Sequence, residues 1–136
     1  MQSAARWLAG VMADKTRKIP GPDHPITVAK NPDRVVVKLG DQVLADTRDA
    51  LSLQESTYPA VQYVPRDDVD FTLLERTEHS TYCPYKGDAS YYSILPAGEA
   101  GVNAVWTYEQ PYDAVADIRD HVAFYADKVS IEIIVD

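Results

Sequence analysis

The 136-residue chain lacks the features that would tie it to a disulfide framework, a nucleic acid or a membrane. Its single cysteine, Cys83, cannot form an internal disulfide, so the fold does not depend on an oxidising compartment. Lys and Arg number 13 against 21 Asp and Glu, and the net charge of −8 repels a phosphate backbone. The sequence therefore predicts no nucleic-acid partner. No apolar run approaches the ~18 residues of a membrane span, so no membrane partner is predicted either.

Residues 1–19 carry the basic cluster Lys15, Arg17 and Lys18, and we expect them to form an N-terminal extension that is flexible or helical. The apolar stretch inside it is shorter than the ~7–15 residues of a secretory signal core, which favours a cytoplasmic protein over an exported one. The sequence leaves open whether Met1 or Met12 is the natural start. Residues 20–136 have the length of one domain.

Alternating apolar residues predict about eight short strands against one or two short helices, and hence a mainly β fold of the α+β kind. Strands are expected at residues 34–39, 43–45, 51–55, 61–63, 89–95, 102–108, 122–125 and 129–135. Four prolines between residues 20 and 33 predict an extended arm without regular structure.

Loops and caps complete this outline. Gly40-Asp41 predicts a hairpin turn, and residues 97–101 and 127–128 are expected to join the later strands. Aspartates at 67 and 68 are expected to cap one helical turn that runs through Leu74, and Asp113 to cap another.

The run Thr81-Tyr-Cys-Pro-Tyr-Lys-Gly87 concentrates nucleophilic, cationic and aromatic groups more than any other segment. Lys86 lies among tyrosines, where partial desolvation would lower its pKa or let it bind an anionic ligand. Cys83 lies three residues before it and has two interpretations, a reactive thiol or, as we favour, a buried structural one. His79 is in phase with Cys83 on an extended strand but too distant for direct contact.

Glu55 is the partner that a buried Lys86 would need. It shares a strand face with Leu51 and Leu53, so it points inward if the leucines face the core. An inward carboxylate must be paired or have a raised pKa, whereas a strand that ended at Gln54 would leave Glu55 in water. Both alternatives stay open at this point.

Four aromatic residues are expected to wall the site: Tyr63, Tyr91, Trp106 and Tyr108. Trp106 and Tyr108 are in phase on an apolar strand face, so they pack in the core unless the sheet opens beside them. The three histidines show no metal-ligand spacing, and neither a metal nor a cofactor is predicted.

Several motifs taken together resemble the family called domain of unknown function 427 (DUF427). They are Pro20–Ile26, Tyr63–Val69, the 81–87 run with Ala89 and Tyr91, Trp106–Tyr108 before Pro111, and Ala123–Tyr125. The resemblance implies a compact single-domain β-tent, a pair of antiparallel sheets that lean together. The family is also catalogued as nucleotidyltransferase-like, a label that implies magnesium held by carboxylates such as Asp67, Asp68 and Asp70. The chain has no glycine-rich phosphate-binding motif, and a helix cap explains these aspartates equally well.

These observations predict a small-ligand-binding domain. Its pocket uses Lys86, Glu55 and Cys83 as polar groups and takes a small anionic molecule; in an enzyme, Lys86 would hold the anion and Glu55 would act as acid or base. Two alternatives are a protein-interaction module without a small ligand and a magnesium-dependent nucleotidyltransferase.

Overall fold

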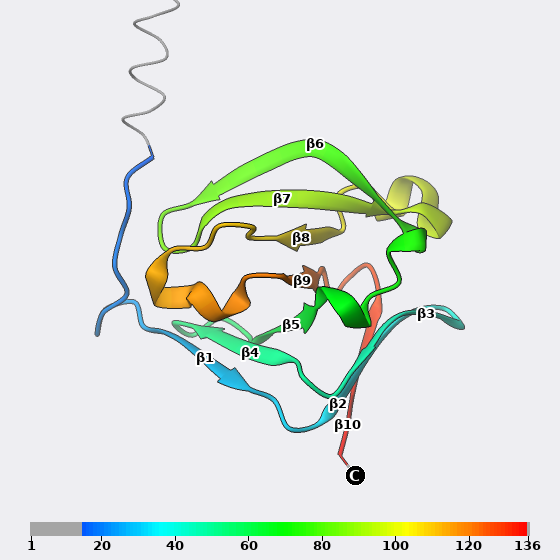
Figure 1. Cartoon of the computed structure of the whole chain (residues 1–136), viewed down its shortest axis with the longest axis horizontal. Helices are drawn as coiled ribbons and strands as arrows, with labels where there is room; N and C mark the ends of the chain where they lie inside the picture. Colours follow the sequence, from blue (N-terminus) through cyan, green and yellow to red (C-terminus); the bar gives the residue numbers. More distant parts are fainter. Residues whose placement is uncertain (1–14, 136) are drawn as a thin grey trace, which may run out of the picture.

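A computed structural model describes residues 15–135, which form two antiparallel sheets (Figure 1). The large sheet has the strand order β1 (Ile26–Lys30), β4 (Leu51–Glu55), β5 (Val61–Pro65), β9 (His121–Phe124), β8 (Val105–Thr107), β7 (Gly87–Ile94), β6 (Leu74–Cys83). The small sheet has the order β10 (Ser130–Ile134), β2 (Arg34–Leu39), β3 (Gln42–Thr47). The predicted mainly β, two-sheet single domain is thus confirmed. Of the predicted extension, residues 1–14 lie outside the described residues, as do the predicted signal and start. Residues 15–19 have no regular structure, and the N–H of Lys18 donates to the carbonyl of Pro84 at 2.8 Å.

Four 3₁₀ turns connect the strands of this described part: η1 (Arg66–Asp68), η2 (Phe71–Leu73), η3 (Leu95–Gly101) and η4 (Asp113–Ile118). No helix among the described residues is long and apolar enough to cross a membrane. The predicted caps are wrong in detail. The side chain of Asp70, rather than Asp67 or Asp68, accepts a hydrogen bond from a backbone N–H of η2, and Tyr112 precedes η4 without a side-chain cap.

The buried residues form two clusters, one on each face of the large sheet. The first lies between the two sheets and includes Val37 and Leu44 of the small sheet with Val64 and Ile94 of the large one. The second lies on the opposite face, where Val115 and Ile118 of η4 pack with Leu53, Tyr63, Tyr91 and Tyr108. The large sheet is therefore buried on both faces, which explains why β5 and β9 contain consecutive buried residues.

Two strands depart from the sequence predictions. The arm before residue 34 contains β1, because its four prolines flank residues 26–30 without interrupting them; β1 pairs with β4 as an edge strand. The polar segment that forms β6 was not predicted as a strand, because most of its side chains are exposed and give no apolar alternation. It forms the other edge of the large sheet and pairs with β7.

The chain crosses between the sheets near its C-terminal end. The predicted strands at 122–125 and 129–135 exist as β9 and β10, but they do not pair with each other: β9 pairs with β5 and β8, and β10 pairs with β2. The strand predicted at 102–108 is also shorter, since β8 begins at Val105 and Val102 is exposed. Local alternation identified these segments, but their partners are set by contacts distant in sequence.

Candidate functional site

A tight hairpin turn between β6 and β7 positions Lys86. Cys83 pairs with Gly87, and the N–H of Lys86 donates to the carbonyl of Cys83 at 3.2 Å. Gly87 has φ +107°, a conformation that side chains rarely adopt, and a Cβ there would lie 3.3 Å from the carbonyl oxygen of Gln110. The carbonyl of Lys86 accepts from the N–H of Tyr112 at 3.1 Å. The backbone of Lys86 is therefore fixed on both sides, and its side chain is directed inward.

Lys86 and Glu55 form a buried ion pair. Lys86 is only 7% exposed, and its ammonium donates to Oε1 of Glu55, whose side chain is 19% exposed. Glu55 is the last residue of β4 and lies on the same face as Leu53, so of the two alternatives for this carboxylate the inward one holds. Its second oxygen, Oε2, accepts from Nε2 of His24 at 2.8 Å.

His24 is the residue of this group that sequence reasoning missed. It precedes β1, whose first residue Ile26 pairs with Glu55, and that register places the imidazole beside the carboxylate. The ring also stacks on Tyr85, with 4.3 Å between the ring centroids. The only sequence signal was its place in the Pro20–Ile26 motif, because a pairing between β1 and β4 cannot be inferred from histidine spacing.

These neighbours determine the ionisation of Glu55. Burial alone would raise the pKa of this carboxyl, but hydrogen bonds from Lys86 and His24, together with their charges, lower the pKa below its usual value of 4.5. A carboxylate whose folded-state pKa is lowered stabilises the fold at pH values above its unfolded pKa. That stabilisation is lost as the pH falls through the folded-state pKa.

This argument predicts a pH-dependent effect of Glu55→Gln. The free energy of unfolding of the wild type should exceed that of the variant at pH 7, and the difference should shrink as the pH falls below 4.5. Other carboxylates with lowered pKa values, such as Asp46 and Glu109, are present in both proteins and cancel in the difference. Urea unfolding at pH 7, 5, 4 and 3 measures this; a difference that stays unchanged down to pH 3 would contradict the pairing.

The Lys86–Glu55 pair opens into a cavity of about 210 Å³. Both residues line the cavity together with the four predicted wall residues Tyr63, Tyr91, Trp106 and Tyr108. Two further aromatic residues, Tyr58 and Tyr125, had not been predicted to belong to it. Tyr58 comes from the loop between β4 and β5, and Tyr125, the last residue of the strand predicted at 122–125, follows β9.

Hydrogen bonds and ring contacts hold the aromatic walls in place. Nε1 of Trp106 donates to the hydroxyl of Tyr63 at 3.1 Å, and the two rings meet edge to face. The hydroxyl of Tyr91 is hydrogen-bonded to Thr81 at 2.8 Å. Burial raises the pKa of Tyr63 and of Tyr108, so both phenols remain protonated at neutral pH and present neutral hydroxyl groups.

Cys83 is the predicted site residue that does not line this cavity. It is partly exposed and packs against the cluster that contains Tyr63 and Tyr91. The imidazole of His79 lies against the ring of Tyr91, with 4.5 Å between centroids, and Tyr91 belongs to the cluster against which Cys83 packs.

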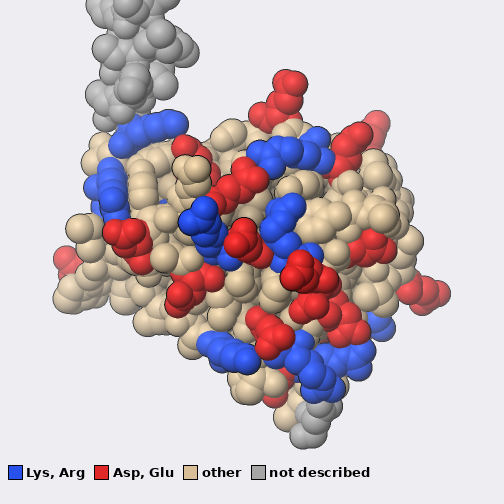
Figure 2. Space-filling model, in the orientation of Figure 1, with Lys and Arg blue, Asp and Glu red and all other residues tan. Residues whose placement is uncertain are grey.

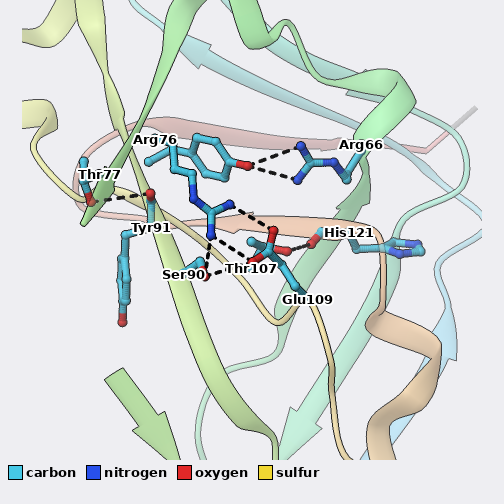
Figure 3. Close-up of polar contacts among 9 residues, drawn as sticks. Arg66, Arg76, Thr77, Ser90, Tyr91, Thr107, Glu109 and His121 are labelled. Atoms are coloured by element: carbon cyan, nitrogen blue, oxygen red, sulfur yellow. Dashed lines mark hydrogen bonds and ion pairs between the residues drawn. The ribbon is translucent and has the colours of Figure 1, made fainter. Parts of the chain in front are cut away.

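A second polar cluster, Arg76, Ser90 and Glu109, braces edge strand β6, and none of the three lines the cavity (Figure 3). The guanidinium of Arg76 donates to both carboxylate oxygens of Glu109 at 2.9 Å, and Ser90 donates to the same carboxylate. The hydrogen bond from Arg76 lowers the pKa of Glu109, so the pair stays ionised at neutral pH. On the face shown in Figure 2, basic and acidic side chains are interspersed.

The aspartates suggested as magnesium ligands have other contacts. Asp68 accepts from the hydroxyl of Thr47 at 2.7 Å, and Asp70 caps η2. Within residues 15–135, no group of three or more His, Cys, Asp or Glu side chains is placed to hold a metal ion.

Fold and site together define the class of the protein, a compact mainly β domain of two antiparallel sheets with a buried Lys–Glu pair beneath an aromatic-walled cavity. A family model described as domain of unknown function (DUF427), with the label NTP_transf_9, matches residues 27–135. The chain belongs to this family, which confirms the resemblance seen in its motifs. No curated protein matches the chain. The family description assigns no activity.

Proposed function

We propose that this protein is a small-ligand-binding domain whose site is the aromatic cavity above Lys86 and Glu55. The observation that carries the proposal is that a buried ion pair opens into a cavity walled by tyrosines and a tryptophan. Ligand sites commonly combine apolar and aromatic walls with a few fixed polar groups. We also propose a cytoplasmic setting, because the single cysteine and the fold need no oxidising compartment.

Lys86 is proposed to bind the polar group of the ligand. A lysine ammonium has three N–H donors, and one of them is donated to Glu55. The others can donate to a carboxylate, a phosphate or a carbonyl oxygen in the cavity, while tyrosine rings stack on the body of the ligand. The carboxylate of Glu55 interacts with His24 as well as with Lys86, so it neutralises the ammonium only in part. Lys86 therefore keeps part of its attraction for an anionic group.

The same pair contains the groups for acid–base chemistry. Glu55 would transfer the proton, and Lys86 would hold an anionic group of the substrate. For Cys83 we propose the role of a packed thiol, since it lies against the buried cluster and does not line the cavity.

A ligand screen tests the proposal. We expect a metabolite that binds the wild type to lose its binding in Lys86→Met and to keep it in the matched control Lys128→Met, because Lys128 is exposed. A ligand at a hundred times its dissociation constant stabilises the fold by ~2.7 kcal/mol, roughly 10 °C in unfolding midpoint for a domain of this size. The measurement is a thermal-shift screen of metabolites and magnesium nucleotides, followed by calorimetric titration of each hit at a temperature where both variants are folded.

The other outcomes favour the alternative functions. Hits restricted to magnesium nucleotides, retained in Lys86→Met and lost in Asp68→Asn or Asp70→Asn, would favour nucleotidyl transfer. A folded wild type that binds nothing in the library would favour the protein-interaction module, with Lys86 and Glu55 as a structural pair.

A further inference from the structure

We infer that the ligand of this site is amphipathic, with a compact polar head in the cavity and an apolar chain in an adjoining groove. The inference rests on the proposed function and extends it to a class of ligand. The groove is a second hollow of about 460 Å³, lined by Ala60, Phe124, Ala126, Ile131 and Ile133 among others. It lies at the junction of the two sheets, because Phe124 belongs to β9 and Ile131 and Ile133 to β10.

The groove and the cavity adjoin. Five residues line both hollows: Tyr58, Pro59, Val61, Trp106 and Tyr125. The rings of Trp106 and Tyr125 lie against each other, 4.6 Å between centroids, and form the divide between the two. A single ligand that passes this divide would contact both.

Short strand pairing explains why the large sheet opens here. β5 and β9 pair only through Val64↔Val122 and Pro65↔His121. The cavity and the groove are lined by residues just beyond that pairing, Val61 on one strand and Tyr125 after the other. Trp106 was expected to act as a cavity wall, and not as a core residue, only if the sheet opened beside it. The fold meets this condition.

The two hollows differ in chemistry. The cavity contains the charged pair Lys86 and Glu55, whereas no Lys, Arg, Asp or Glu is among the described residues of the groove. The one amide that lines the groove, Gln62, accepts hydrogen bonds from Asn31 and Ser52 through its Oε1. A polar head therefore suits the cavity, and an apolar chain suits the groove.

Size points to the same division. The cavity alone is smaller than the ~300–1,000 Å³ usual for ligand pockets, so it suits a head group, whereas the groove lies within that range. The groove is also open to solvent, since Ile133 is 49% and Tyr58 61% exposed. An apolar chain would bury this surface, which an isolated head group in the cavity would leave in water.

The test uses two homologous series of probes, 4-alkylbenzoates and 4-alkylbenzamides, with unbranched alkyl chains of one to eight carbons. In the wild type we expect each added methylene to tighten the dissociation constant by about three- to fourfold until the groove is filled. The slope of the logarithm of the dissociation constant against alkyl chain length reports on the groove. The comparison of benzoate with benzamide reports separately on the charge of the head at Lys86.

Ile133→Asn should flatten the slope and leave the affinity for the one-carbon members unchanged. The matched control is Leu95→Asn, which alters a residue of similar exposure, 51%, on η3 outside both hollows. It should retain the wild-type slope. Lys86→Met should weaken all members of the benzoate series equally, since it alters the head site only.

Three results would overturn the inference. Short members that bind at Lys86 with no dependence on chain length would reject the chain site and leave the proposed cavity intact. No binding by any member of either series would reject both. A wild type that is dimeric in sedimentation and becomes monomeric in Ile133→Asn would assign the groove to an interface between two copies of the chain.

Discussion

Glu55→Leu is expected to lower the free energy of unfolding by about 3–5 kcal/mol, the usual cost of breaking a buried ion pair. The variant leaves the ammonium of Lys86, which is 7% exposed, without its carboxylate partner. At roughly 4 °C per kcal/mol for a domain of this size, the unfolding midpoint should fall by roughly 12–20 °C. Urea unfolding followed by tryptophan fluorescence and by circular dichroism measures the change.

The double variant Glu55→Leu/Lys86→Met makes this result specific to the pair. Lys86→Met alone should cost less than Glu55→Leu, because the remaining carboxylate keeps His24 as a partner. Replacement of both charges by apolar groups of similar volume should restore much of the loss, so the double variant should be more stable than Glu55→Leu. Strictly additive losses in the cycle would show that the two charges are not coupled.

Tyr63→Ala is expected to destabilise the protein by a similar amount, about 3–5 kcal/mol. Tyr63 is almost fully buried and forms part of both the second core cluster and the cavity wall. Its removal would enlarge the cavity toward Leu53 and leave the wall beside Trp106 without support. Chemical unfolding measures the loss.

Tyr63→Phe is the matched control for the hydroxyl. It keeps the ring and removes the acceptor for Nε1 of Trp106, so it should cost about 1 kcal/mol. The emission of Trp106 should shift in both variants, although by more in Tyr63→Ala. Equal losses in the two variants would show that the hydroxyl, not the ring, supports the wall.

Part of the site could be predicted because it depends on local geometry. The phase of β4 placed Glu55 on the face of Leu53, and the concentration of cationic and aromatic groups in the 81–87 run marked Lys86 as a polar residue of the site. The strands with clean apolar alternation, such as β2, were located for the same reason. β6 was not, because an edge strand with exposed polar side chains carries no periodic signal.

The sequence by itself determined a mainly β domain, its family and the residue types that gather at the site, because these follow from composition, alternation and ordered motifs. Only the tertiary structure decided which strands pair and therefore which side chains meet. The pairing of β1 with β4 brings His24 to Glu55, and the pairing of β5 with β9 ends before Val61 and Tyr125, which line the cavity with Trp106. Such contacts join residues distant in the chain, and the free energy that selects them comes from burying both faces of the large sheet, which no local pattern encodes.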